Sequence, residues 1–125
     1  MQPRPSAIEI LSVVAEVLER DIVPALSGPA QHHARVAASL VGIVERELRL
    51  GPEQREREAA MLADALADLV SPADLVAARA RFAASLRAGA ADDDTANAET
   101  WARLFASVRD DLAISKPGHD GWQGE

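Results

Sequence analysis

The chain has no cysteine and very few aromatic residues, and each absence narrows what the protein can be. Without cysteine there are no disulfides, no thiolate nucleophile and no cysteine-based zinc site. Aromatic residues make up 3% of the chain and tyrosine is missing. The core must therefore come from Leu, Val and Ile, and from alanine-rich helix faces that approach closely. Hydrophobic residues still account for 48% of the chain, which is typical of a globular protein.

Basic residues are also scarce. Thirteen Lys and Arg stand against twenty Asp and Glu, and the net charge of −7 argues against a nucleic-acid partner, because phosphate neutralisation needs a basic face. No uncharged run approaches the roughly 18 residues of a membrane span. Glu9 and Glu16 interrupt the apolar stretch that follows Arg4, so it does not resemble a signal peptide. We expect a cytoplasmic protein that binds neither membranes nor nucleic acid.

The pattern of apolar residues predicts an all-α fold. Ser6 and Glu9 form a capping box at the start of the first helix, Pro24 ends that helix, and Gly51 followed by Pro52 ends the second. We expect a compact bundle of about five antiparallel helices with short loops, forming one domain over residues 1–114, with an irregular tail over residues 115–125. The five helices cover residues 7–23, 29–50, 53–70, 72–89 and 97–114. Leu62, Leu66 and Leu69 of the third helix and Leu75, Phe82 and Leu86 of the fourth are predicted to face the core.

The first of these helices is unusually apolar. Its polar positions form one narrow stripe, and nearly everything else over residues 7–23 is aliphatic. Such a helix is either central to its bundle or half covered by a second chain. We therefore expect a homo-oligomer or another protein partner, with Val13 and Val17 at the interface. Gly42 lies on a small-residue stripe of the second helix, where another backbone can approach closely.

The second helix carries the candidate ligand-binding residues. Adjacent His32 and His33 point about 100° apart on a helix, so they cannot chelate one metal. His33 shares a stripe with apolar residues, which leaves two alternatives: a hydrogen-bonded core histidine, or a ligand-binding or proton-transfer residue. Arg35, one turn before Ser39, either clamps a carboxylate or phosphate or pairs with an acid of a neighbouring helix.

Other motifs indicate structure more than chemistry. The acids at residues 92–94 lack the alternating ligands of a calcium loop and fit the N-terminus of the fifth helix. Trp101 belongs to the apolar ladder of that helix, and either Trp101 or Trp122 is a candidate to close a cavity shared by His33 and Arg35. Trp122 in the tail either folds back over the bundle or docks onto a partner chain. We find no catalytic residues, metal site or cofactor motif, so we do not expect an enzyme.

Several motifs together resemble a small bacterial family of unknown function, the domain-of-unknown-function family number 6285. They cover nearly the whole chain: RPSA at residues 4–7, VPALSG at 23–28, HARVAA at 33–38, ERELRLGP at 45–52, LRAG at 86–89 and LAISKP at 112–117. One departure is Ser39, which stands where the family pattern has an asparagine.

The resemblance implies a cellular context. Members of this family lie beside, or are joined to, kinases similar to aminoglycoside phosphotransferases, often with an acyl-CoA dehydrogenase nearby. This chain has no kinase motif and would be the accessory part. We therefore expect a non-catalytic interaction module that serves a phosphotransferase-like kinase in acyl-CoA-related metabolism. The alternative is a small-ligand or acyl-CoA-binding domain with its site near His33 and Arg35.

Overall fold

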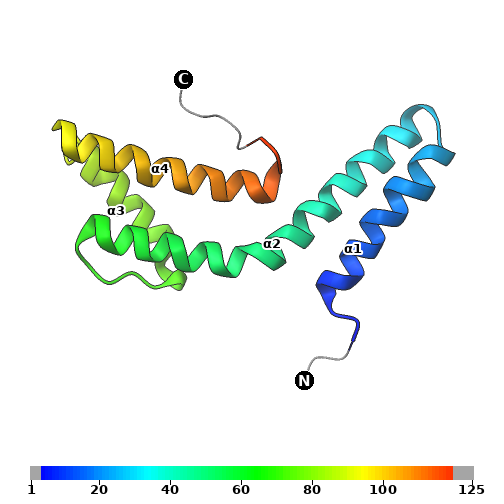
Figure 1. Cartoon of the computed structure of the whole chain (residues 1–125), viewed down its shortest axis with the longest axis horizontal. Helices are drawn as coiled ribbons and strands as arrows, with labels where there is room; N and C mark the ends of the chain where they lie inside the picture. The colour runs from blue at the N-terminus through cyan, green and yellow to red at the C-terminus, as the bar shows by residue number, and fades with distance from the viewer. Residues whose placement is uncertain (1–3, 120–125) are drawn as a thin grey trace. The chain divides into compact units, whose positions relative to one another are not determined.

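The computed structural model describes residues 4–119, and within them the protein is all-α, as predicted (Figure 1). The four α-helices are α1 (Ala7–Val17), α2 (Gly28–Leu66), α3 (Leu75–Arg87) and α4 (Asp94–Ser115). The chain divides into two compact units, Met1–Gly51 and Pro52–Glu125, and α2 contributes to both. A single bundle over residues 1–114 stays a prediction.

The predicted capping box at the start of α1 is confirmed. The Oγ of Ser6 accepts the backbone N–H of Glu9 at 3.2 Å, and the Glu9 carboxylate accepts the backbone N–H of Ser6 at 2.7 Å. Two of the four N–H groups that a helix start leaves unpaired are thereby satisfied. The hydrogen bond from the Ser6 N–H lowers the pKa of Glu9, because it stabilises the ionised carboxylate.

The end of the first helix is irregular, and Pro24 explains why. After Val17 the backbone passes through a π-helical turn, Leu18–Ile22, and a 3₁₀ turn, Val23–Ala25. Proline has no N–H and crowds the carbonyl four residues before it, so the α-helical hydrogen-bond pattern cannot continue through residue 24. The Gln31 side chain donates to the backbone carbonyl of Val23 at 3.0 Å, which joins the start of α2 to this segment.

The prediction of five helices is wrong because the expected second and third helices are one. α2 is 39 residues long and contains Pro52, and Gly51 is not among the glycines with positive φ. Pro52 costs one backbone hydrogen bond and crowds the carbonyl of Leu48, at about 3 kcal/mol. The flanking residues are mostly Arg, Glu, Gln and Leu, all good helix formers, and they carry the helix through the proline.

Within the first unit, α1 and the first part of α2 form a helical hairpin. Figure 1 shows α1 lying antiparallel beside that part of α2. The row that α1 turns toward α2 holds half-buried Ile8, Leu11, Ala15 and Leu18. Over residues 4–50, the buried apolar side chains are those of Ala34 and Ala38. The hairpin thus buries small side chains tightly and leaves its large ones partly open.

The second unit has a core of the ordinary kind. Leu62 is 1% exposed and belongs to a cluster contributed by α2 and α3. The members of the cluster are Ala59, Leu62, Leu75, Ala78 and Phe82, with partly buried Met61, Ala65, Leu66, Val70 and Leu86 packed against it. The predicted inward positions Leu75, Phe82 and Leu86 are confirmed. The large side chains missing from the interior of the hairpin are present here.

α2 ends at Leu66 in a Schellman arrangement, and this ending corrects a second prediction. Ala67 has φ of 50°, its N–H bonds to the carbonyl of Asp64, and the N–H of Asp68 bonds to that of Ala63. Because the helix stops there, Leu69 does not reach the core at the expected helical spacing. Its side chain is 95% exposed.

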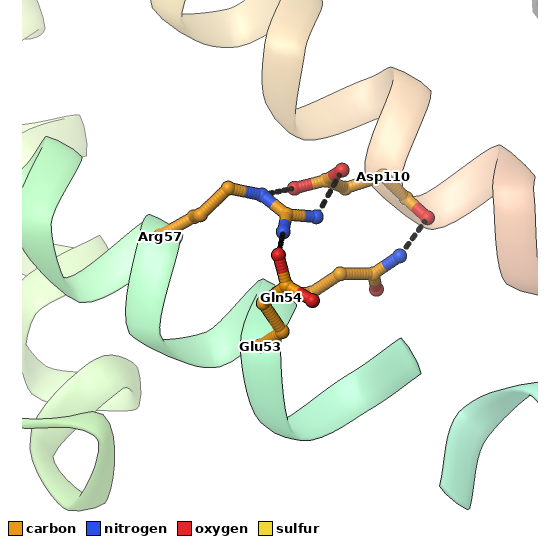
Figure 2. Close-up of polar contacts among 4 residues, drawn as sticks. All are labelled: Glu53, Gln54, Arg57 and Asp110. Atoms are coloured by element: carbon orange, nitrogen blue, oxygen red, sulfur yellow. Dashed lines mark hydrogen bonds and ion pairs between the residues drawn. The ribbon is translucent and has the colours of Figure 1, made fainter. Parts of the chain in front are cut away.

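Polar contacts join α4 to the second part of α2. The Arg57 guanidinium donates to both carboxylate oxygens of Asp110, at 2.8 and 3.2 Å, and also to Glu53 at 2.8 Å (Figure 2). The Gln54 amide donates to the backbone carbonyl of Asp110 at 2.8 Å. The hydrogen bond to Asp110 raises the pKa of Arg57, because it stabilises the charged guanidinium.

A second ion pair also joins α4 to α2. Arg103 of α4 pairs with Asp64 of α2 at 2.6 Å. Residue 57 of α2 thus pairs with residue 110 of α4, and residue 64 with residue 103, so the two segments run antiparallel. The prediction that the acids of residues 92–94 lie at the N-terminus of this helix is confirmed, because the Asp93 carboxylate accepts the N–H of Ala96 at 2.9 Å. α4 begins at Asp94, three residues before the predicted start.

Candidate functional site

The hairpin carries an exposed row of aliphatic side chains along α1. Ile10, Val13, Val14 and Val17 follow the i, i+3, i+4, i+7 spacing of one helix side. Their exposed fractions run from 37% for Val17 to 58% for Val13. The first helix was predicted to be either central to its bundle or half covered by a second chain, with Val13 and Val17 as interface residues. Both side chains are open in the structure.

A matching row follows the first part of α2. Val36, Leu40, Val44 and Leu48 recur every four residues and are 43–57% exposed. The sequence places these residues on the apolar side of the second helix, but their exposure was not predicted. The apolar arc, which also includes Ala37, Val41 and Ile43, is wider than one neighbouring helix can cover. That width is the signal by which the sequence could have identified this row.

The two rows lie on the same side of the hairpin. Successive side chains on an α-helix are about 100° apart around its axis. Counted in the direction of increasing residue number, the exposed row on each helix is rotated by about a third of a turn, in the same sense, from the row that contacts the other helix. Because the helices are antiparallel, equal rotations bring both rows to one side. We call this surface the apolar face; it consists of Ile10, Val13, Val14, Val17, Val36, Leu40, Val44 and Leu48.

A groove of about 650 Å³ runs along the first turns of α1 and shares residues with the apolar face. Its lining is largely aliphatic, and the acids beside it come from both helices. The lining residues are Pro5, Ile8, Glu9, Ile10, Ser12, Val13, Val14 and Glu45. An aliphatic surface edged by charged groups is the usual composition of the centre and rim of a protein interface.

The other side of the hairpin holds a cavity of about 410 Å³ with a different character. Its lining combines charged groups with small residues of α2, and includes three of the predicted site residues: Arg35, Ser39 and Gly42. The remaining lining residues are Glu19, Val23, Ala38 and Arg46. The Arg46 guanidinium lies over Gly42, where an added Cβ would meet its Nη1 at 3.1 Å. A larger side chain at position 42 would force Arg46 to move.

His33 does not join this cavity. It is two positions from Arg35, so the two side chains leave α2 about 200° apart. Its imidazole is exposed, with its ring centroid 6.0 Å from that of His32, and the prediction of a core histidine is wrong. The helix side that carries His33 is the open side of α2, which is why its apolar neighbours do not bury it.

Trp101 belongs to α4 of the second unit and is not among the lining residues of this cavity. Its side chain is 62% exposed, and Leu104 and Val108 of the same helix are 39% and 55% exposed. The predicted apolar ladder of this helix is therefore open at these three positions. Trp122, the other tryptophan named from the sequence, lies outside the described residues.

The described residues contain no group of three or more His, Asp or Glu side chains placed to hold a metal ion. Within the same part of the chain, no helix has both the length and the hydropathy to cross a membrane.

The hairpin offers two surfaces of different chemical character: an aliphatic face, and an arginine-containing cavity on the opposite side.

Comparison with known proteins gives a family but no activity. No curated protein matches the chain significantly, and no solved structure does so. One family matches, beginning at Pro24, so α1 precedes the matched segment and α2, α3 and α4 lie within it. Because the match covers residues 24–119 of a 125-residue chain, the protein belongs to the family described as a domain of unknown function, DUF6285.

Proposed function

We propose that the protein is a non-catalytic interaction module that binds a helical protein surface through the apolar face of the α1–α2 hairpin. The observation that carries the proposal is the contrast within the hairpin: eight large aliphatic side chains are open on one side, while two alanines are buried. A contiguous apolar surface with charged edges is typical of a protein-binding site.

The magnitude of the exposed surface supports a specific complex. Burying a Val, Leu or Ile side chain stabilises by roughly 1.5–3 kcal/mol, and each member of the face is about half exposed, so each contributes on the order of 1 kcal/mol on binding. Eight such contributions are comparable with the roughly 4–15 kcal/mol that association costs in lost freedom. The face can therefore sustain binding when a complementary surface covers most of it.

The partners to test are those expected from the resemblance: a phosphotransferase-like kinase encoded beside this protein, or a second copy of the chain. In that context the module would serve acyl-CoA-related metabolism without performing chemistry itself. The kinase complex is tested by mixing the two purified proteins and measuring mass by light scattering behind size-exclusion chromatography. We expect a stable complex that Val13→Glu abolishes.

Val76→Glu is the matched control. Val76 is 80% exposed in α3 and lies outside the apolar face, so the same chemical change there leaves binding intact. A complex that survives Val13→Glu, or that both variants weaken equally, would exclude the apolar face as the binding surface.

A second candidate function is the binding of a small anionic ligand such as an acyl-CoA in the cavity beside Arg35. The supporting observation is that Arg35 and Ser39 line one cavity, and that the Arg35 guanidinium has no ion-pair partner among residues 4–119. Isothermal titration with CoA and acetyl-CoA tests it. We expect Arg35→Ala to remove binding and Arg87→Ala, at an exposed arginine of α3, to leave it unchanged. Equal loss in both variants would exclude the cavity.

A further inference from the structure

We infer that the occupant of the apolar face is a second copy of this chain, so that the hairpins of two copies pack face to face as a four-helix arrangement. The inference rests on the proposed function, because it names the partner of the same face. Four observations support a second copy. The hairpin buries few side chains, its exposed rows are regularly spaced, the apolar face has an area close to that of a dimer interface, and the face carries no charge.

The hairpin needs a partner that is always present. Isolated helices of the length of α1 are marginal in water, and helices in proteins are stabilised mainly by burying an amphipathic face. Here the contact between α1 and α2 buries Ala34 and Ala38 fully, and the larger aliphatic side chains stay half-buried or exposed. A second copy is available wherever the chain is made and in equal amount, whereas a different protein must be made in step with it.

The rows of the apolar face suit self-packing. Val36, Leu40, Val44 and Leu48 form an uninterrupted i+4 ridge along more than three turns of α2. Ridges of this type on two helices interdigitate at about −50°, the commonest class of helix packing. In an isologous interface the same surface of both copies forms the contact. Two identical ridges related by a two-fold axis can therefore pack against each other at this angle.

The area is of the size that a stable dimer needs. With exposed fractions of 37–58%, the eight residues present on the order of 600 Å² per copy, against about 800 Å² per partner in a standard interface. The charged residues at the edge of the face supply the remainder as a polar rim. Glu16 and Arg20, one such pair, are joined at 2.6 Å.

Net charge opposes the association of two copies, but the apolar face itself carries no charge. Each copy carries a net charge of −7, so two copies repel at long range, while none of the eight face residues is charged. Added salt screens the repulsion and strengthens apolar contact, so the dimer should tighten as ionic strength rises. A basic partner held by charge would show the opposite dependence.

The test is the mass of the full-length protein in solution as a function of concentration and salt. We expect a particle of twice the 13.3 kDa chain mass, with a dissociation constant that falls from low to high salt. Leu40→Glu places a carboxylate on each copy in the centre of the contact and should weaken the dimer at least ~100-fold. Leu69→Glu is the matched control, because Leu69 is 95% exposed and lies outside the face.

Cysteine cross-linking decides the matter even if Leu40→Glu fails to fold. The chain has no cysteine, so Val36→Cys, Leu40→Cys and Val44→Cys each introduce a single thiol on the ridge. Mild oxidation should join two copies by a disulfide through at least one of these positions, the one nearest the two-fold axis, whereas Leu69→Cys should form no disulfide between the copies of the dimer.

The remaining outcomes separate the two proposals. If the wild type is monomeric and binds the kinase, and Val13→Glu abolishes that binding, the inference of a second copy is overturned and the proposed function as an interaction module stands. A dimer that survives Leu40→Glu and gives no cross-link on the ridge uses another surface, which also overturns the inference. A monomer whose face binds neither protein overturns both proposals.

Discussion

Replacing Leu62 by alanine should destabilise the second unit more than any other single truncation in α2. Leu62 is 1% exposed and lies in the cluster with Leu75 and Phe82. The change removes three carbon atoms, worth about 0.8 kcal/mol each when buried, and leaves a cavity that the surrounding helices fill only in part. We expect a loss of about 3–4 kcal/mol in the free energy of unfolding.

A loss of that size is a large share of the roughly 5–15 kcal/mol that stabilises a typical domain. Urea unfolding followed by circular dichroism measures it, with the midpoint shifting and the slope retained if the cooperative unit is unchanged. If the two units unfold in separate transitions, the shift belongs to the transition of residues 52–119.

Leu69→Ala provides the comparison, because it is the same chemical change at a side chain that is 95% exposed. We expect it to alter the free energy of unfolding by less than about 0.5 kcal/mol. A loss below about 1 kcal/mol for Leu62→Ala, or similar losses for both variants, would show that the α2–α3 cluster is not the core of this unit.

Three further changes test local features of the fold. Ser6→Ala removes the cap of α1 and should cost about 1 kcal/mol by thermal unfolding; the contribution of Glu9, whose pKa is lowered on folding, is present above its unfolded pKa and is lost as pH falls through the folded value. Ala67→Gly relieves a positive φ of 50° and should raise stability by about 0.5–1 kcal/mol in urea, whereas a loss would contradict the left-handed cap. Arg81→Leu should raise the pKa of Asp68, which the hydrogen bond from Arg81 lowers, in a titration followed by NMR; an unchanged value would exclude that ion pair.

Local signals near helix starts were readable from the sequence. The box formed by Ser6 and Glu9, the acid at Asp93, and the inward positions Leu75 and Phe82 all depend on residues close in the chain, or on a periodicity that one neighbouring helix satisfies. Such features depend little on the rest of the molecule, so local chemistry is enough to predict them.

The errors came where the balance between competing local terms decided the outcome. Gly51 followed by Pro52 predicts a break, yet the helix formers on both sides outweigh one lost hydrogen bond. Ala67 carries no signal for a left-handed cap, since glycine is the usual residue there. At the candidate site, Arg35 and Ser39 share a cavity as their spacing implied, but His33 follows the open side of the helix, which periodicity alone cannot distinguish from a buried one.

The first unit buries fewer large side chains than the second, and this difference affects the local stability of the two units. Backbone amides exchange with solvent, and proteases cut, where local opening costs least, and a hairpin stabilised by two buried alanines opens at lower cost than a unit built around Leu62 and Phe82. Covering the hairpin suppresses that opening by mass action. A partner that covers the apolar face, as proposed above, should therefore slow amide exchange and proteolysis in the α1–α2 hairpin.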